Sequence, residues 1–370
     1  MKNNIIKLTL ALTGIGGWLG FDTNTALAQY KEINLVGYQP GMARFTDPKL
    51  NGWGMAYAPG GPFCNANTVP GVATFYDKNG KISPLVISIP PSQHPFFGPT
   101  GTPTGLTYNP THEFIISKNG KSASAIFIFD ALDGAISGWN PAVDPNNAVI
   151  VRDQSANGSV YSGLTLGKNS RGQSIIYAAN FGLSRVDMFD GSFHFLGSFT
   201  DPNVATQYPR HNVFGVENED GKLYVTFGAF DPPFGGVVDV FDLDGNLLTP
   251  NHFAANAPNA GPLVNPWAVT RAPRNFGKFS GALLIGNVED GKIHAYNPET
   301  GALLGAMSDA SGNPLVIPGL WDLSFGGGSR LNGRPNQLFF NAGPNAVDFA
   351  GNGLFGKILA AEANEDEDED

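Results

Sequence analysis

Side chains that could bind a ligand recur along the chain at intervals of roughly 40 to 55 residues, next to short apolar segments. Most of them are aromatic rings and amides, and few are carboxylates. Rings and amides can stack against a neutral polar ligand and hydrogen-bond to it. By type and position, the candidates for ligand binding are Trp53, Tyr161, His211, Asn212, Trp267 and Trp321.

A smaller set of oxygen-bearing side chains could hold a hard cation. Calcium prefers carboxylate, amide and carbonyl oxygens in proteins. The sequence therefore makes calcium a candidate cofactor, and no other cofactor is indicated. The candidates for metal binding are Asp231, Asp322, Asn180 and Asn287.

Both sets have a structural alternative. An Asn at the end of a strand often caps a turn, and a Trp at the start of equivalent segments often packs between them. A residue that is present in every repeat favours this structural role. His211, Asp231 and Asp322 depart from the repeat and are therefore the stronger candidates for function.

The sequence predicts no catalytic residue. It contains no G-x-S-x-G motif for a serine nucleophile. The six histidines, at 94, 112, 194, 211, 252 and 294, occur singly and form no H-x-x-x-H pair of zinc ligands. The single cysteine, Cys64, has no neighbouring His or Asp motif to activate it, and it excludes an intramolecular disulfide.

The apolar segments that carry these residues repeat about six times. Each copy has one short apolar segment, a second that ends in Asn, and a third that is closed by an Asp/Asn/Gly turn. The clearest third segments are 72–80, 237–246 and 292–301. A period of this length, made of short strands and tight turns, is typical of a β-propeller. The 48 glycines, 28 prolines and 15% charged residues agree with an all-β chain.

We therefore expect a six-bladed β-propeller. In such a fold the entrances of the inner strands and the loops that link second to third strands surround the mouth of the central channel, which is the default binding face. The inner strands are expected at 53–57, 105–108, 163–166, 211–214, 265–269 and 320–325. In blade two, 113–117 and 125–129 are expected as the second and third strands.

The last blade is one strand short, and the segment 30–36 is a surplus strand at the other end of the chain. Pairing this segment with the last blade would close the ring and remove two open sheet edges that invite aggregation. We therefore predict that the final blade is completed by the N-terminal strand.

The two ends of the chain are predicted to lie outside the propeller of residues 29–361. Residues 1–28 resemble a signal peptide, with Lys2 and Lys7, an apolar stretch over 8–19 and a small-residue cleavage pattern at 26–28. We therefore expect export to the periplasm or the medium. Residues 362–370 contain seven acidic residues and are expected to form a disordered, solvated tail.

Charge and hydropathy exclude two classes of partner. The formal net charge is −10, and the acidic tail accounts for most of it, so the rest of the chain is near neutral. Neither nucleic acid nor an anionic membrane surface is an expected partner. No segment after the leader has 18 uninterrupted apolar residues, so no transmembrane segment is expected in the mature chain.

Several motifs resemble those of an uncharacterised family of exported bacterial proteins. They are 51–54, 103–105, 136–141, 281–287 and 338–345, and the likeness covers nearly all of 33–360. The resemblance implies a six-bladed propeller similar to the NHL, TolB-like and calcium-dependent gluconolactonase groups, without an established activity. This chain has Gly52 where the family has Pro, and Ala268 and Asp322 where it has Gly after Trp. Asp322 places a carboxylate at the channel mouth, which strengthens it as a cation ligand.

Three functions remain open at this point. The first is binding of a small ligand, a glycan or a protein partner at the channel mouth. The second is a calcium-dependent lactonase or esterase-type hydrolase, in which a metal held by Asp231 and Asp322 polarises a carbonyl and activates water. The similar lactonases place an acidic ligand at the start of the first blade, where 51–53 has none. The third is a structural component of the cell envelope.

Overall fold

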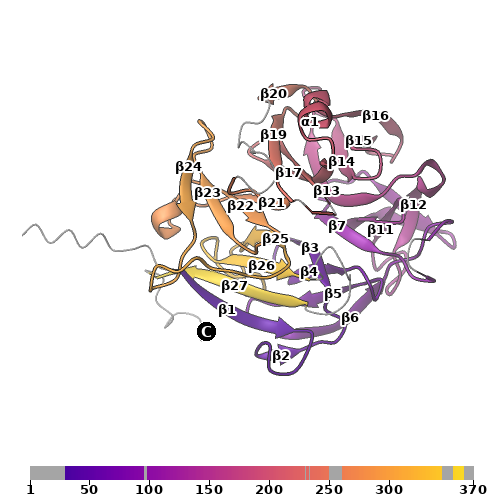
Figure 1. The fold of residues 1–370 in the computed structure, drawn as a ribbon. Coiled ribbons are helices and arrows are strands. Elements are labelled where there is room, and N and C mark those ends of the chain that lie inside the picture. Colours follow the sequence, from indigo (N-terminus) through magenta and orange to yellow (C-terminus); the bar gives the residue numbers. More distant parts are fainter. Residues whose placement is uncertain are drawn as a thin grey trace, which may run out of the picture.

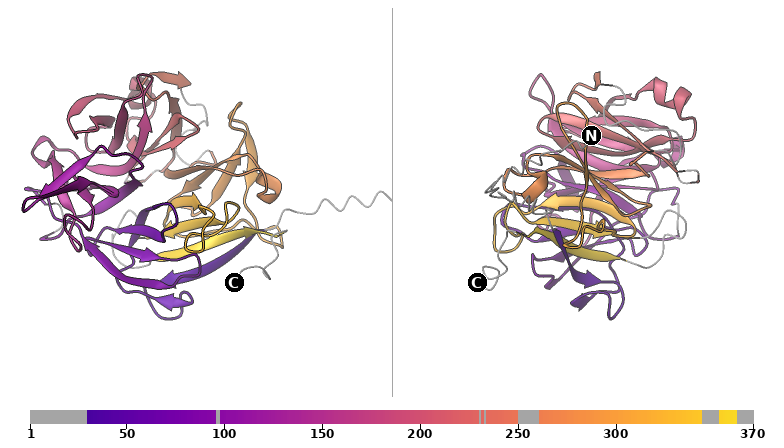
Figure 2. Two further views of the ribbon diagram at one scale, coloured as in Figure 1. Left: turned by 180° about the vertical axis from the view of Figure 1, so that it is seen from behind. Right: turned by 60° about the vertical axis from the view of Figure 1, so that its left-hand side comes forward.

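The computed structural model describes residues 30–95, 98–229, 231–232, 234–249, 261–343 and 353–361. These residues form a six-bladed β-propeller, in which the blades radiate from a central channel (Figure 1). Two further views show the ring from behind and from the side (Figure 2). The predicted signal peptide and acidic tail lie outside the described residues. No helix in the described ranges is long and apolar enough to cross a bilayer.

Each blade is a sheet of four antiparallel strands with one strand innermost, and blade six carries in addition a short parallel strand at its edge. Blade one contains β3 (Gly52–Tyr57), β4 (Phe63–Asn67), β5 (Val72–Tyr76) and β6 (Ile82–Ser88). Blade two contains β7 (Pro103–Tyr108), β10 (Phe127–Ala131), β11 (Ala135–Trp139) and β12 (Val149–Asp153). Blade three contains β13 (Tyr161–Lys168), β14 (Ser174–Asn180), β15 (Arg185–Asp190) and β16 (Phe195–Phe199).

The second half of the ring repeats this order. Blade four contains β17 (Asn212–Glu219), β18 (Lys222–Gly228), β19 (Val237–Phe241) and β20 (Leu247–Thr249). Blade five contains β21 (Pro266–Arg271), β22 (Leu283–Asn287), β23 (Ile293–Tyr296) and β24 (Leu303–Ala306). Blade six contains β25 (Leu320–Phe325), β26 (Leu338–Ala342), β27 (Leu354–Ala360) and β1 (Tyr30–Gly37), with the short β2 (Phe45–Thr46) at its edge.

The predicted closure of the ring is confirmed. β1 pairs antiparallel with β27, from Tyr30 opposite Ala360 to Gly37 opposite Leu354. Figure 1 shows the indigo N-terminal strand beside the yellow C-terminal strand. The Tyr30 hydroxyl donates to the Phe276 carbonyl over 3.0 Å and accepts from the Phe279 N–H over 3.1 Å, which also ties β1 to blade five. Because β1 pairs with β27, the last strand of the chain does not remain as an open edge.

The prediction for blade two is wrong in one element. Residues Ile115–Lys118 (β8) and Lys121–Ser124 (β9) form a separate hairpin, and the second strand of the blade is β10. Asn119 and Gly120 have φ of 52° and 78°, as a two-residue hairpin turn requires. Ile115 is 51% exposed and Ile116 is 1% exposed, so one face of the hairpin packs on the core of blade two while the hairpin stays outside the blade sheet.

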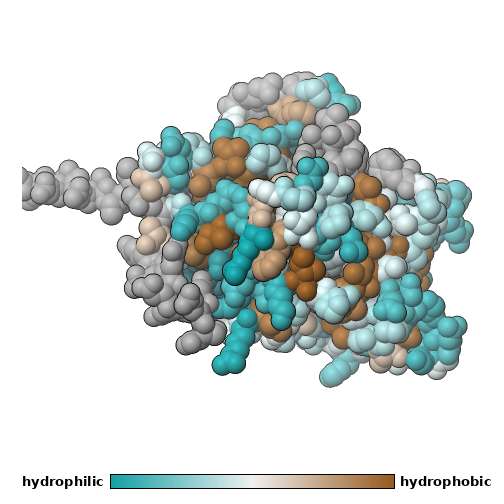
Figure 3. All heavy atoms as spheres, turned by 90° about the horizontal axis from the view of Figure 1, so that it is seen from below, coloured by the Kyte–Doolittle hydropathy of each residue, from teal (hydrophilic) through white to brown (hydrophobic). Residues whose placement is uncertain are grey.

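Apolar side chains fill the spaces between neighbouring blades, because each sheet is covered on both faces. On the surface drawn in Figure 3, hydrophobic residues are scattered among hydrophilic ones. Near the channel the inner strands approach so closely that glycine is required. A Cβ on Gly105 would lie 2.3 Å from the Leu164 nitrogen, and one on Gly163 would lie 3.2 Å from the Gly215 Cα. Short helical turns occur only in connections: Ser155–Asn157, α1 (Pro202–Gln207) and Gly277–Phe279.

Candidate ligand-binding cavity

An aromatic plug fills the channel at the end where the inner strands begin. We define the plug as Trp53, Phe214, Trp267 and Trp321, which are 0%, 0%, 2% and 0% exposed. Trp53 stacks on Trp321 with ring centroids 3.6 Å apart. Phe214 of blade four lies 5.6 Å from Trp321 of blade six, so this contact crosses the channel. The Trp267 indole N–H donates to the Ser162 carbonyl over 2.7 Å, which links blades five and three.

A β-bulge in the inner strand directs each plug residue into the channel. The register between the first and second strands shifts between Gly52 and Met55, Val213 and Gly215, Pro266 and Ala268, and Leu320 and Asp322. A bulge leaves a residue unpaired and re-aims its side chain. These shifts skip Phe214, Trp267 and Trp321, and in blade one both Trp53 and Gly54, so the recurrence of the plug residues has a packing function in this fold.

Two of the predicted ligand-binding residues also make internal contacts. The Tyr161 hydroxyl donates to Asp187 Oδ2 over 3.0 Å, and burial together with the Asp187 charge raises the pKa of Tyr161. His211 is buried against Tyr208 with ring centroids 5.9 Å apart, and burial lowers the pKa of its imidazole. Asn212 begins β17 and is half-buried. Ligand contacts by Trp53, Trp267 and Trp321 and by these residues stay a prediction.

The four predicted metal ligands do not form one site in the described structure. Asn180 Oδ1 accepts the N–H groups of Val160 and Leu183, each over 3.2 Å, and so caps a turn. The Asn287 side-chain amide donates to the Pro262 carbonyl over 2.7 Å. The Asp231 side chain is 84% exposed and lies 3.8 Å from Arg210. None of these three is a hydrogen-bond partner of Asp322.

The described residues also contain no group of three or more His, Cys, Asp or Glu side chains that could hold a metal ion. The donor set predicted for calcium therefore does not fit this arrangement, and no reaction step through calcium is derived from it.

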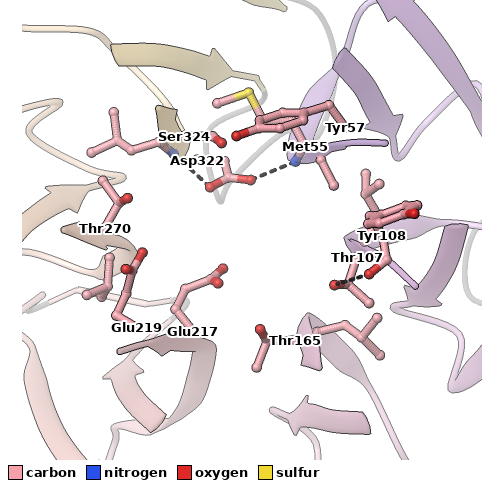
Figure 4. A pocket seen from close by; sticks show the side chains of 15 residues that line it. Met55, Tyr57, Thr107, Tyr108, Thr165, Glu217, Glu219, Thr270, Asp322 and Ser324 are labelled. Carbon is pink, nitrogen blue, oxygen red and sulfur yellow. Dashed lines mark hydrogen bonds between the residues drawn. The ribbon is translucent and has the colours of Figure 1, made fainter. Parts of the chain in front are cut away.

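Beyond the plug, toward the ends of the inner strands, lies a cavity of about 240 Å³. It lies on the far side of the plug from the predicted channel mouth. All six inner strands contribute to it (Figure 4). We call it the central cavity, and its lining is Met55, Ala56, Tyr57, Leu106, Thr107, Tyr108, Leu164, Thr165, Glu217, Glu219, Val269, Thr270, Asp322, Leu323 and Ser324.

One position of the repeat gives the central cavity its hydroxyl groups. In each inner strand it is the third residue after the plug position, as Thr270 is after Trp267. Four blades have a hydroxyl there, blade one has Ala56, and blade four has Glu217. The four hydroxyl residues are Thr107, Thr165, Thr270 and Ser324. The cavity is therefore a polar ring in which blade four contributes a carboxylate instead of a hydroxyl.

Asp322 is a second departure from the repeat. Its equivalents in the other blades are Gly or Ala, and its carboxylate points into the central cavity (Figure 4). Asp322 is 7% exposed. Its Oδ2 accepts the Met55 N–H over 2.6 Å, and its Oδ1 accepts the Leu323 N–H over 2.7 Å. Burial raises the pKa of Asp322 to about 8, against the lowering effect of these two hydrogen bonds.

Glu217 and Glu219 add two more carboxyl groups from β17. Burial raises the pKa of Glu217 well above its usual value, and the negative charges of Asp322 and Glu219 raise it further. Burial also raises the pKa of Glu219 to about 7, although hydrogen bonds from Thr270 and Arg271 favour its charged form. Among the described residues that line the cavity, none is Lys, Arg or His. The Arg271 charge acts on Glu219 from outside the lining, and the remaining negative charge is balanced by bound protons or by a cation that enters the cavity.

Sequence reasoning identified Asp322 and missed Glu217 and Glu219. Asp322 was found because it departs from Gly directly after a Trp. Glu217 is the third residue after the plug residue of its strand, where four other blades have Thr or Ser. An alignment of the six inner strands carried to their ends would have shown this difference.

The sequence has relatives among viral proteins of unknown function. Uncharacterized protein L690 of Acanthamoeba polyphaga mimivirus is 30% identical over 320 residues, which is 82% of this chain and 81% of that protein. Uncharacterized protein R648 of the same virus is 29% identical over 358 residues, which is 91% of this chain and 82% of that protein. No model of a known protein family matches the sequence, so membership of the exported bacterial family stays a prediction.

Solved structures resemble this chain in fold. The PQQ-bound aldose sugar dehydrogenase of Streptomyces coelicolor is 11% identical with a TM-score of 0.50, and the likeness covers 90% of this chain and 99% of that one. Virginiamycin B lyase of Staphylococcus aureus is 13% identical with a TM-score of 0.46, covering 90% and 99% of the two chains. At these identities the likeness concerns the fold alone.

Proposed function

We propose that this chain, which belongs to the family of uncharacterized protein L690 of Acanthamoeba polyphaga mimivirus, is a binding propeller whose central cavity holds a small positively charged organic ligand. The observation that carries the proposal is the placement of Asp322, Glu217 and Glu219 around one cavity that no basic side chain lines. Carboxylates that burial makes costly to ionise are stabilised when a cation enters beside them.

The size of the cavity favours a small ligand. Pockets for drug-sized molecules have volumes of roughly 300–1,000 Å³, and this one measures about 240 Å³. Its wall combines carboxylates and hydroxyls with the side chains of Met55, Tyr57 and Tyr108. A ligand with a charged nitrogen, a hydrogen-bonding group and a short carbon frame matches this lining.

An organic cation matches the geometry better than a bare metal ion. Calcium requires six to eight oxygen ligands at about 2.3–2.6 Å. The carboxyl groups of Asp322 and Glu217 project from blades six and four toward a shared space (Figure 4). No described carboxylate cluster meets the requirement for a metal. An ammonium ion carries its charge on a larger body and can lie between groups that do not converge on a point.

Isothermal titration calorimetry with two small ammonium probes, choline and ethanolamine, tests the proposal at pH 8. We expect saturable binding of at least one probe to wild type, and an affinity at least tenfold weaker in Glu217→Gln, because a desolvated charge–charge contact is lost. Glu113→Gln makes the same charge change at an exposed loop residue and should leave the affinity unchanged. The proposal is contradicted if neither probe binds to wild type, or if Glu217→Gln and Glu113→Gln weaken the affinity equally.

Export remains a separate proposal that rests on the leader-like composition of residues 1–28. If the leader is cleaved, full-length chain expressed in a bacterium will appear outside the cytoplasm with Gln29 as its first residue. Mass spectrometry of the N-terminal peptide from each cell fraction measures this. Recovery of uncleaved chain from the cytoplasm alone contradicts it.

A further inference from the structure

We propose that the central cavity prefers a quaternary ammonium ligand to a primary amine, an inference that rests on the proposed function. The argument uses the wall of blades one and two, which contains two tyrosine rings and a methionine. Tyr57, Tyr108 and Met55 all line the cavity. Figure 4 shows Tyr57 and Tyr108 on the side of the cavity away from Glu217 and Glu219.

The Tyr57 ring is held in place by its own contacts. Its hydroxyl donates to the Phe325 carbonyl over 3.0 Å. Its ring packs edge-on against Phe63, with centroids 5.2 Å apart at 82°. Burial raises the pKa of Tyr57, and the nearby Glu219 charge adds to this effect, so the phenol stays neutral. A neutral, fixed ring is the kind that attracts a cation through its π-face.

Tyr108 provides the second ring, on the neighbouring inner strand. It contacts Phe127 with ring centroids 6.4 Å apart at 66°, which fixes its position from behind. Both tyrosines are partly exposed in their strands, so both can meet a molecule in the cavity. Blades one and two therefore present a ring pair to a ligand that blade four attracts by charge.

Several hydrogen-bond acceptors in the cavity already accept hydrogen bonds from the protein itself. Both Asp322 oxygens accept backbone N–H groups, from Met55 and Leu323. Glu219 receives hydrogen bonds from Thr270 and from the Arg271 backbone. A primary ammonium needs three acceptors when it leaves water, whereas a quaternary ammonium needs none. The quaternary ion loses weaker hydration and gains contact with rings and aliphatic groups.

The remaining lining agrees with this choice. Leu106, Leu164, Val269 and Leu323 line the cavity along the inner strands, but their side chains are buried in the cores between the blades. Methyl groups on a ligand nitrogen would therefore contact Tyr57, Tyr108 and Met55, while the hydroxyls of Thr107 and Thr165 can bond a ligand hydroxyl. The inferred class is therefore a small quaternary ammonium alcohol.

Three matched probes separate this inference from the proposed function. Choline and ethanolamine differ by three N-methyl groups, and 3,3-dimethyl-1-butanol keeps the shape of choline with carbon in place of the charged nitrogen. In calorimetric titrations of wild type at pH 8, we expect choline to bind at least tenfold more tightly than either of the others. If ethanolamine binds as tightly as choline, the preference is refuted and the proposed function stands. If the neutral alcohol equals choline, or nothing binds, both are refuted.

Variants of Tyr108 test whether the tyrosine rings cause the preference for choline over ethanolamine. Tyr108→Leu should reduce the choline affinity by about tenfold and leave ethanolamine nearly unchanged, whereas Tyr108→Phe keeps the ring and should bind choline like wild type. Melting curves by circular dichroism establish that each variant is folded. If Tyr57→Leu does not fold because it loses its bond to Phe325, the Tyr108 pair alone still decides the outcome. An equal choline affinity in Tyr108→Leu and Tyr108→Phe contradicts the inference.

Discussion

The two halves of the central channel are built from neighbouring residues of the same inner strands, yet their chemistry differs. At the entrance end, Trp53, Phe214, Trp267 and Trp321 fill the channel and contact one another across it. Three residues further along β25, Ser324 lines an open polar cavity. Aromatic plug residues recur in four of the six blades, whereas blades two and three have Thr104 and Ser162 there, and the carboxylates of the cavity do not recur.

This difference shows how a repeated fold can carry a specific site. A side-chain type that recurs in several blades satisfies a requirement that those blades share, which here is filling the channel where bulges aim residues inward. Asp322 and Glu217 each occupy a position where the other blades have small or hydroxyl residues. They make the cavity acidic at a cost in desolvation, so the repeat does not explain them.

The comparison predicts its largest effect on stability at the plug. Trp321→Ala removes a fully buried side chain that stacks on Trp53, and we expect it to lower the free energy of unfolding by about 3–5 kcal/mol. Ser324→Ala, on the same strand, should change it by less than about 1 kcal/mol. Urea titrations of the two variants measure this contrast. Similar losses in both would contradict the division of the channel into two halves.

Giving blade four the residue type that most other blades have at this position should stabilise the ligand-free protein. Glu217→Thr gives blade four the residue type that Thr107, Thr165 and Thr270 provide elsewhere. At pH 8.5 the buried glutamate must either be ionised or keep a proton, and both cost free energy. We therefore expect the free energy of unfolding of the variant to exceed that of wild type by an amount on the order of 1 kcal/mol at pH 8.5, and to equal it at pH 5. Choline binding should be lost. Thermal and urea melts at both pH values test this, and destabilisation at pH 8.5 would contradict it.

The cavity also predicts a dependence of stability on pH. The pKa of Asp322 is raised to about 8 in the folded protein from a usual value of 3.8. Between these values the folded state holds a proton that the unfolded chain has released, so the free energy of unfolding falls as pH rises toward 8. From pH 7 to 9 we expect a loss of about 1 kcal/mol from Asp322, and the raised pKa values of Glu217 and Glu219 add to this loss. Burial lowers the pKa of His211 and of His294, so both are neutral throughout this range. Stability that is constant or rises across the range contradicts the assignment.

The smallest effect is expected far from the channel. Ile115 lies on the β8–β9 hairpin outside the blade sheets and is 51% exposed. Ile115→Ser should therefore change the free energy of unfolding by no more than about 0.5 kcal/mol. A loss as large as that of Trp321→Ala would mean that Ile115 itself packs in the core.

Much of the fold followed from the sequence because propeller blades are local units. Strand spacing and turn residues predicted six blades, and the surplus strand over 30–36 predicted the closure that β1 and β27 make. The prediction of a blade strand over 113–117 is wrong, because β8 and β9 form a hairpin outside the blade sheet. Its Asn119-Gly120 turn between lysines was a local signal for a hairpin, but the apolar residues before it suggested a core strand.

Less of the site could be predicted. Asp322 stood out in the sequence, but which end of the channel is open depends on side-chain volume and on bulges in separate inner strands. The stacking of Trp53 on Trp321 joins residues at opposite ends of the sequence, and no local pattern reveals it. For the same reason, the rings and amides expected at the channel mouth proved to make internal contacts, such as that of Trp267 with the Ser162 carbonyl.

A crystal structure of the wild-type protein grown with choline at pH 8.5 tests the central claim most directly. The account predicts one choline in the central cavity, with its nitrogen between Glu217 and the Tyr57 and Tyr108 rings, and an unchanged aromatic plug. Choline bound at the plug end, or a cavity closed by repacked side chains in the presence of saturating choline, would contradict it.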